Sequence, residues 1–214
     1  GSEMCIRDRD QSEEEEPSRF ERLTEDAVLQ EGFFDTYQKD RELFLLIPED
    51  RLGEDFLMTF EASQGPGTGG VHGGTMLERE ARLVSLEKIQ GRIFLTQRPT
   101  IYRASEDSAV EQAIDATFGT SVLATARIAA TRDSTDHLID IHDWFISDIS
   151  GISQRLRGAL SSGENRGGGG ASLDESRSYL DSVKSFPQNM TINSRLTFRS
   201  GSNPSLRSVA DSRY

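Results

Sequence analysis

Short segments rich in strand-forming residues, each bounded by turn residues, are the feature that most constrains the fold of this 214-residue chain. Residues 33–38 and 42–47 carry aromatic, β-branched and aliphatic side chains. They are separated by a turn that begins with the polar pair Lys39 and Asp40, and two such segments around a short polar turn predict a β-hairpin. Pro48 and Gly53 then favour a second turn before the next strand.

The same succession of strands and turns continues along most of the chain. Further strands are expected at residues 55–62, 75–80, 82–88, 92–96, 122–130, 137–145 and 190–198. Strands that follow one another at such short spacing usually pair with their neighbours, so the pattern predicts an antiparallel meander. The expected fold class is mainly β (α+β), with two or three helices packed on the sheet.

Two helices are expected within the β-rich part of the chain. Ser108 and Glu111 have the spacing of a capping box, and an apolar stripe at helical period follows them before Gly119 ends the segment. A shorter helix over residues 24–30 is indicated by Thr24, which can cap a helix N-terminus, and by the acidic residues after it.

The C-terminal part of the chain is predicted to begin with a third helix. Ser172 and Glu175 repeat the capping-box spacing, and Pro187 would end a helix that reaches about residue 185. The segment before it, residues 155–170, contains four consecutive glycines and is predicted to be a break. The predicted organisation is a disordered leader at 1–20, a β-rich domain at 21–160, a glycine-rich linker at 161–171, and a helix plus strand at 172–214 that starts a truncated following segment.

Composition excludes several classes of protein. The formal net charge of −12 would repel phosphate backbones, so no nucleic acid partner is expected. No apolar run approaches the roughly 20 residues that cross a bilayer, so no membrane span is expected, and the first residues given do not show the charged-then-apolar pattern of an export signal. The single cysteine, Cys5, excludes an internal disulfide framework.

Residues 4–9 resemble a translated sequencing adapter, as found in metagenomic fragments, so the native start is expected further upstream.

A glycine-rich segment formally matches a phosphate-binding motif. Residues 65–70 fit the pattern G-x-G-x-x-G, in which backbone amides approach a pyrophosphate at a helix N-terminus. The residues that follow alternate like a strand and open no helix. A loop or hairpin turn is therefore the favoured interpretation, and nucleotide binding is the alternative.

The histidines and three of the aspartates are candidate metal ligands. The chain has only His72, His137 and His142, and no H-E-x-x-H motif, so these are interpreted as surface or edge histidines. Three aspartates, Asp140, Asp143 and Asp148, could supply oxygen ligands for a calcium ion that would stabilise a small β domain. The favoured interpretation is that they bond to local backbone at a strand end and a turn.

No catalytic residue, cofactor-binding residue or metal ligand is assigned within this chain. A G-x-S-x-G nucleophile elbow is absent from the sequence, and Cys5 has no histidine near it in sequence. With 36 acidic residues, pairs of carboxylates arise by chance and nominate no acid and base.

Several short segments carry a resemblance to a known family. They are residues 31–37 with 43–48, residues 121–124, residues 139–145, and residues 176–179 with 186–189. They resemble, in the same order, the N-terminal domain of unknown function of bacterial zinc-dependent metalloproteases, and the resemblance spans about residues 31–214. The resemblance implies that the zinc (Zn) and its H-E-x-x-H motif belong to a catalytic domain downstream in the same chain. It also implies a periplasmic or extracellular parent protein.

Two functions from different classes follow. In the leading hypothesis the chain is a non-catalytic accessory or scaffold region of an exported zinc-dependent metalloprotease, whose partners are the downstream catalytic domain and a peptide substrate held at a sheet edge or groove. The alternative is a non-enzymatic, β-rich binding module of the cell envelope.

Overall fold

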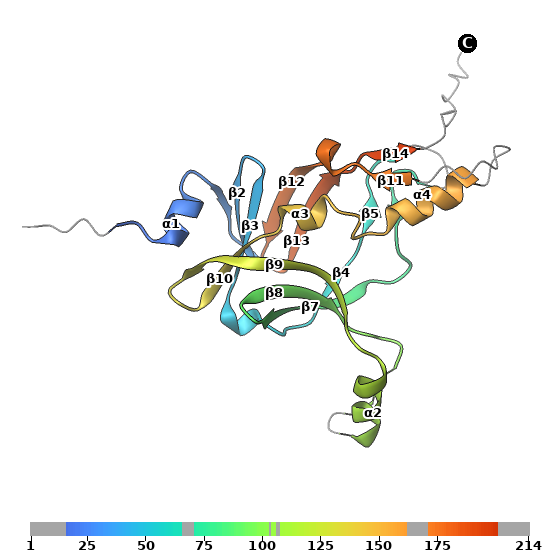
Figure 1. Ribbon diagram of the computed structural model, residues 1–214, viewed down its shortest axis with the longest axis horizontal. Coiled ribbons are helices and arrows are strands. Elements are labelled where there is room, and N and C mark those ends of the chain that lie inside the picture. The colour runs from blue at the N-terminus through green and yellow to red at the C-terminus, as the bar shows by residue number, and fades with distance from the viewer. Residues whose placement is uncertain (1–15, 66–70, 103, 106–107, 162–170, 201–214) are drawn as a thin grey trace, which may run out of the picture.

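The computed structural model describes residues 16–65, 71–102, 104–105, 108–161 and 171–200. An eight-stranded antiparallel sheet forms its centre, in the order β1-β2-β3-β10-β9-β8-β7-β4 (Figure 1). This arrangement confirms the mainly β, antiparallel prediction. The strands are β1 (Val28–Gln30), β2 (Asp35–Lys39), β3 (Glu42–Ile47), β4 (Phe56–Met58), β7 (Arg82–Ile89), β8 (Arg92–Gln97), β9 (Ser121–Arg132) and β10 (Asp136–Asp140).

The long strand β9 curls this sheet. Its first part pairs with β8 and its last residues pair with β10, so one strand joins the two halves of the sheet. The register shifts between Leu95 and Thr96 on one side and between Leu138 and Ile139 on the other. Such bulges increase the local twist of a sheet, and the sheet accordingly bends into a concave layer.

Strand β3 shows how the core is divided between the two faces of the sheet. Leu43, Leu45 and Ile47 contribute to the main core on one face, whereas Phe44 and Leu46 contribute to a second cluster on the other. These five consecutive residues are at most 3% exposed, because side chains that alternate along a strand are covered on both faces.

A second hairpin covers the concave face. It consists of β12 (Tyr179–Phe186) and β13 (Asn189–Arg195), and Val183 of β12 lies in the main core. The Phe33 amide donates to the Phe186 carbonyl oxygen at 2.7 Å, which joins the hairpin to the segment before β2. Gly32 permits this approach: a Cβ atom there would lie 2.8 Å from the Phe186 backbone nitrogen.

Four short strands and four α-helices complete the described chain. The strands are β5 (Glu61–Ala62) paired with β6 (Thr75–Met76), and β11 (Ala171–Leu173) paired with β14 (Phe198–Ser200). The helices are α1 (Arg19–Thr24), α2 (Ala109–Thr117), α3 (His142–Phe145) and α4 (Ile152–Ser161), with 3₁₀ turns η1 (Glu49–Arg51) and η2 (Glu175–Arg177). None of the helices in the described residues is long and apolar enough to span a membrane.

The prediction for residues 24–30 is wrong. Helix α1 ends at Thr24, where the prediction had it begin, and residues 28–30 form strand β1. The capping box is made instead by Ser18 and Glu21, whose side chain and backbone groups bond reciprocally. Residues 28–30 pair with β2 instead, whereas an isolated helix of seven residues would be only marginally stable.

The predicted helix over residues 172–185 is also wrong. Strand β11, turn η2 and most of strand β12 occupy this segment, and Pro187 lies in the turn of the β12–β13 hairpin. Asp174, between the two expected capping residues, has a buried carboxylate that accepts bonds from the side chains of Arg177 and Arg199. That network holds the chain in a turn where the capping-box spacing predicted a first helical turn.

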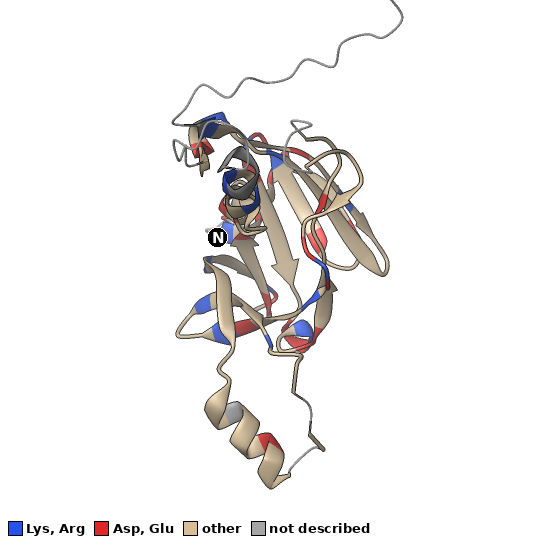
Figure 2. Ribbon diagram, turned by 90° about the vertical axis from the view of Figure 1, so that its right-hand side faces the viewer, with Lys and Arg blue, Asp and Glu red and all other residues tan. Residues whose placement is uncertain are grey.

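Helix α2 exists as predicted but does not pack on the sheet. The Ser108 side chain accepts a bond from the Glu111 amide, which confirms the N-cap. Two views show α2 projecting from the end of the sheet on its own connections (Figures 1 and 2). Val110 is therefore 61% exposed, and Tyr102 stacks on Phe118 at 4.6 Å beside the helix.

Two smaller predictions also differ from the structure. Residues 152–161 form helix α4 where a break was expected from residue 155, because Leu156 packs in a third cluster with Ala62, Val71 and Ala171. The strand expected over 137–145 ends at Asp140, and α3 follows it.

Candidate binding groove

An open groove of about 1410 Å³ lies over the concave face of the sheet. Its floor is formed by buried aliphatic residues of the main core: Leu45, Leu86, Leu95 and Ile141. One border is the segment of β4 and β5, and the opposite border is β13. The groove therefore combines an apolar floor with two borders made of strands.

An aromatic cluster forms one end of the groove. Phe33 contacts Phe34 and Phe56 edge-on, with ring centroids 4.8 and 5.9 Å apart. The Arg51 guanidinium lies 5.0 Å from the Phe33 ring centroid, where the face of the ring attracts a cation. These contacts fix the rings in place, so this wall is formed before any ligand arrives.

Helix α3 supplies another wall. Trp144 is nearly buried, and its indole N–H donates to the Thr125 carbonyl oxygen at 3.2 Å. The loop after α3 is held by Arg82, which donates to the Ile149 carbonyl oxygen at 3.1 Å and forms an ion pair with Glu78. The sheet thus positions the loop and the tryptophan together.

The backbone of β13 is open on its groove side. Within the described residues β13 pairs only with β12. The Val183 carbonyl oxygen and the Ser185 amide of β12 both bond to the Gln30 side chain, so these two residues turn their backbone groups away from β13. In an antiparallel pair, two residues directly opposite each other turn their backbone groups either both toward each other or both away. Ile192 lies opposite Val183 and Met190 lies opposite Ser185, so both direct their N–H and C=O groups away from β12.

Strand β4 provides the second open edge. It is the last strand of the eight-stranded order and pairs only with β7 among the described residues. Leu57 is 70% exposed there, which is unusual for a large apolar side chain beside a groove. Two strand edges that pair on one side only among the described residues therefore border one groove with an apolar floor.

Polar residues line the rim of the groove. Asp55, Glu61 and Asp181 carry negative charge and Arg195 carries positive charge. Asp55 is paired with Arg98 at 3.0 Å, but this pair is partly exposed and contributes little to stability. The rim is therefore charged where the floor is apolar, and a ligand would meet the charges of the rim at the edges of the groove.

The three histidines lie apart, and one contradicts its sequence interpretation. His137 is only 2% exposed and neither ring nitrogen has a hydrogen-bond partner, so it is no surface or edge histidine. It was misplaced because its β10 position lies between β3 and β9 in the centre of the sheet. Burial lowers the pKa of His137, Lys88 lowers it further, and Glu49 and Asp136 oppose the shift.

The other two histidines are accessible. His72 is exposed and its Nδ1 lies 3.0 Å from the Gly73 carbonyl oxygen. His142 is partly buried with its Nδ1 3.3 Å from Asp143. Among the residues that the structure describes, no group of three or more His, Cys, Asp or Glu side chains is placed to hold a metal ion.

Two of the three aspartates near α3 bond to local backbone, as predicted, and Asp143 does not. Asp140 accepts a bond from the His142 amide at 2.9 Å, and Asp148 accepts one from the Ser153 amide at 3.2 Å. The side chain of Asp143 is 95% exposed and points to solvent. These three carboxylates therefore lie in separate settings.

The glycine-rich motif falls largely outside the described residues, which omit 66–70, and so does Cys5. The chain that follows the motif forms strand β6, so it does not open the helix that a dinucleotide fingerprint requires.

Sequence reasoning missed the groove and one buried carboxylate. The alternation of Met190 and Ile192 with polar residues was a visible signal for β13, but its open edge depends on the distant residue Gln30. Asp174 lies within the helix predicted over residues 172–185, and no role was predicted for its carboxylate. Bonds from Arg199, Ser176 and Arg177 hold the pKa of its carboxyl well below the usual range.

Together the fold and the groove define a curled antiparallel-sheet protein with an apolar-floored groove between two open strand edges. A family model described as "Domain of unknown function (DUF5117)" matches residues 74–212, and a second, "Domain of unknown function (DUF5118)", matches residues 17–65. The first covers more than half of the chain, so the chain belongs to the DUF5117 family. No curated protein and no solved structure shows a significant match.

Proposed function

We propose that this chain is a non-catalytic accessory module that holds an extended polypeptide in the groove between β4 and β13. The polypeptide would add as a strand to an open edge, and every second side chain of the polypeptide would enter the groove above its apolar floor. In this proposal the module forms the substrate-side wall of an exported zinc-dependent metalloprotease, and the metal and its chemistry belong to another part of the parent protein.

The observation that carries the binding proposal is the pair of open edges beside an apolar floor. An unpaired edge presents N–H and C=O groups that an extended chain can satisfy, and natural proteins usually cover or charge such edges. Here Met190 and Ile192 direct their backbone groups outward, and their side chains pack against the main core. The backbone groups are thus held rigidly by the core below them.

The proposal of a metalloprotease parent has separate support. It rests on the resemblance of segments such as residues 43–48 and 139–145, which here form β3, β10 and α3. Ile141 and Trp144 of the second segment line the groove. The segment that carries the family resemblance therefore lines the groove in which the binding proposal places a peptide.

Binding to the groove is tested with a short peptide of alternating valine and serine. Fluorescence anisotropy of the labelled peptide should show saturable binding to the protein. A peptide of the same sequence with N-methyl groups at alternate amides should bind at least about tenfold more weakly, because each lost main-chain bond contributes ~1 kcal/mol. Equal binding of the two peptides would contradict strand addition.

The edge of β13 is tested with a matched pair of variants. Met190→Pro removes the outward N–H without removing a bond to β12, whereas Met190→Ala removes side-chain contacts and keeps the N–H. The proline variant should weaken peptide binding about fivefold or more relative to the alanine variant, since an unpaired peptide carbonyl costs ~1–1.5 kcal/mol. Urea unfolding of both variants checks that each remains folded.

The parent-enzyme proposal is tested on the gene. The reading frame that encodes this chain should also encode an H-E-x-x-H motif and a segment for export. A continuous frame without the motif would refute the metalloprotease assignment and leave the peptide-binding experiment unaffected.

A further inference from the structure

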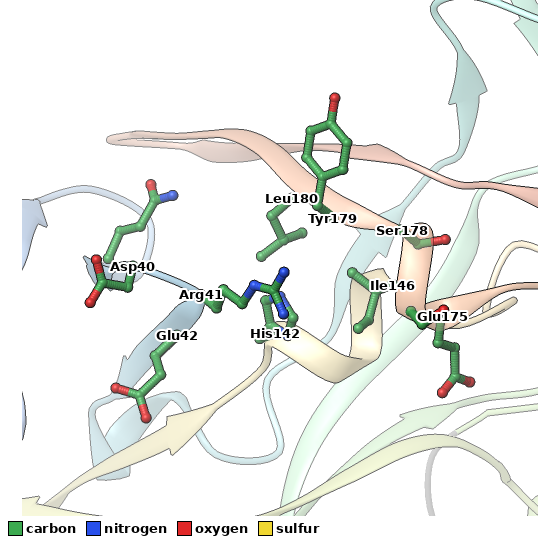
Figure 3. Close-up of a pocket in the computed structure, with 11 residues that line it drawn as sticks. Asp40, Arg41, Glu42, His142, Ile146, Glu175, Ser178, Tyr179 and Leu180 are labelled. Carbon is green, nitrogen blue, oxygen red and sulfur yellow. The ribbon is translucent and has the colours of Figure 1, made fainter.

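A second, smaller pocket lies where three distant segments of the chain meet (Figure 3). It has a volume of about 190 Å³ and shares none of its lining residues with the groove. The turn between β2 and β3 forms one side, α3 and the residue after it form the base, and the start of β12 with η2 closes the other side. Its walls thus come from both family-matched regions, residues 17–65 and 74–212.

The Arg41 guanidinium faces this pocket and has no ion-pair partner among the residues that the structure describes. Figure 3 shows its side chain extending from the β2–β3 turn toward the centre of the cavity, above His142. No carboxylate of the described residues forms an ion pair or hydrogen bond with it. The carboxylates of Asp40, Glu42 and Glu175 belong to the lining but point away from the guanidinium in the same view.

This arrangement differs from that of the other arginines near the C-terminal strands. Arg177 and Arg199 both donate to the buried carboxylate of Asp174, so each guanidinium already has a charged partner. Ser178 lines the pocket, but its hydroxyl donates to the Asp174 carbonyl oxygen and accepts from the Thr197 amide. The strong donor left facing the cavity is therefore Arg41, and the His142 side chain lies beside it in Figure 3.

Apolar side chains complete the lining. Ile146 of the segment after α3 and Leu180 of β12 face the cavity on either side of the guanidinium. A volume of 190 Å³ corresponds to roughly six water molecules at about 30 Å³ each. The space suits a carboxylate and a branched aliphatic group of roughly six to nine non-hydrogen atoms together, and any further part of the ligand would lie outside the pocket.

We propose that this pocket binds a carboxylate carried on a short aliphatic group. The Arg41 guanidinium engages both carboxylate oxygens in its planar fork, and His142 donates a further bond. Ile146 and Leu180 contact the aliphatic group. Two sources have this chemistry: a free short-chain carboxylic acid, and the carboxyl-terminal residue of a polypeptide.

The experiment is a titration of the isotope-labelled full chain, followed by NMR at the Arg41 side-chain Nε–H group. The probes are 4-methylpentanoate, N-acetyl-leucine and N-acetyl-leucinamide. The two acids should shift the Arg41 signal saturably, and the amide, which has the same aliphatic group and no charge, should not. Tighter binding of N-acetyl-leucine assigns the polypeptide source, and tighter binding of 4-methylpentanoate assigns the free acid.

A matched pair of variants distinguishes this pocket from general attraction of anions. Arg41→Gln should weaken acid binding at least about tenfold, because charge-assisted bonds to a carboxylate are the strong ones. Arg127→Gln removes the same charge from an exposed position of β9 that does not line the pocket, and should leave the affinity unchanged. Equal effects of the two variants, binding of the amide as tight as that of the acid, or no shift with any probe would overturn the proposal.

Discussion

Replacing Gly32 with alanine tests how the β12–β13 hairpin is joined to the sheet. A Cβ atom at this position would lie 2.8 Å from the Phe186 backbone nitrogen and 2.8 Å from the Ser185 carbonyl carbon. Both are backbone atoms, so neither can rotate away, and the hairpin must move. Movement would also strain the bond from the Phe33 amide to the Phe186 carbonyl oxygen.

The expected cost follows from these contacts. Overpacking of a tight site costs about 1–3 kcal/mol, and one weakened backbone bond adds ~1 kcal/mol. We therefore expect Gly32→Ala to lower the free energy of unfolding by about 2–4 kcal/mol. Urea unfolding followed through the single tryptophan, Trp144, measures this directly, because its ring lies in the main core beside the hairpin.

Gly119→Ala is the control for this prediction. No atom lies within 4 Å of the position a Cβ would take at Gly119, and the residue has no left-handed backbone. This variant should unfold within about 0.5 kcal/mol of the wild type. The reasoning is refuted if Gly32→Ala and Gly119→Ala unfold at the same urea concentration.

Three further predictions concern single side chains. Histidine in the unfolded chain takes up a proton near pH 6.5, whereas burial keeps His137 neutral to lower pH, so folded stability should fall as pH drops below about 6.5, by up to about 1.4 kcal/mol per pH unit. His137→Leu should remove that part of the loss, which urea unfolding at pH 7.5 and 5.5 measures. Asp174→Asn should lower the melting temperature at neutral pH, because Arg177 and Arg199 lose their charged partner. Folding lowers the pKa of Asp174, so the wild type should lose this stabilisation as pH falls below about 4. The difference in melting temperature between Asp174→Asn and the wild type should therefore shrink at low pH, and an unchanged difference would contradict the ion-pair account. Val110→Ser on the exposed face of α2 should change the free energy of unfolding by no more than about 0.5 kcal/mol, and a larger loss would show that α2 packs against the sheet.

The parts of the fold that local sequence determines were predicted well. The hairpin of β2 and β3 and the strands β7 and β8 lie where alternation and turn residues placed them. The β7–β8 turn consists of Gln90 and Gly91, both with positive φ, which suits the twist of a two-residue hairpin. These two hairpins close through short turns and depend on few distant residues, so local sequence was sufficient to predict them.

The errors come from contacts between segments that are far apart in sequence. The segment 172–185 carries a capping-box signal, but Asp174 bonds to Arg199 and β12 bonds to Gln30, and neither partner is local. His137 looked like an edge residue because nothing in its neighbourhood shows that β10 is enclosed by β3 and β9. The groove escaped prediction for the same reason, since its two borders are about 130 residues apart in the chain.

Amide hydrogen exchange at Met190 and Ile192 tests the central claim most directly. In the free protein these amides should exchange faster than that of Thr191, because their N–H groups face away from β12. Saturation with the alternating valine and serine peptide should slow exchange at both positions, and the N-methylated peptide should not. Slow exchange at both amides in the free protein, or a bound peptide that leaves them unprotected, would contradict strand addition at this edge.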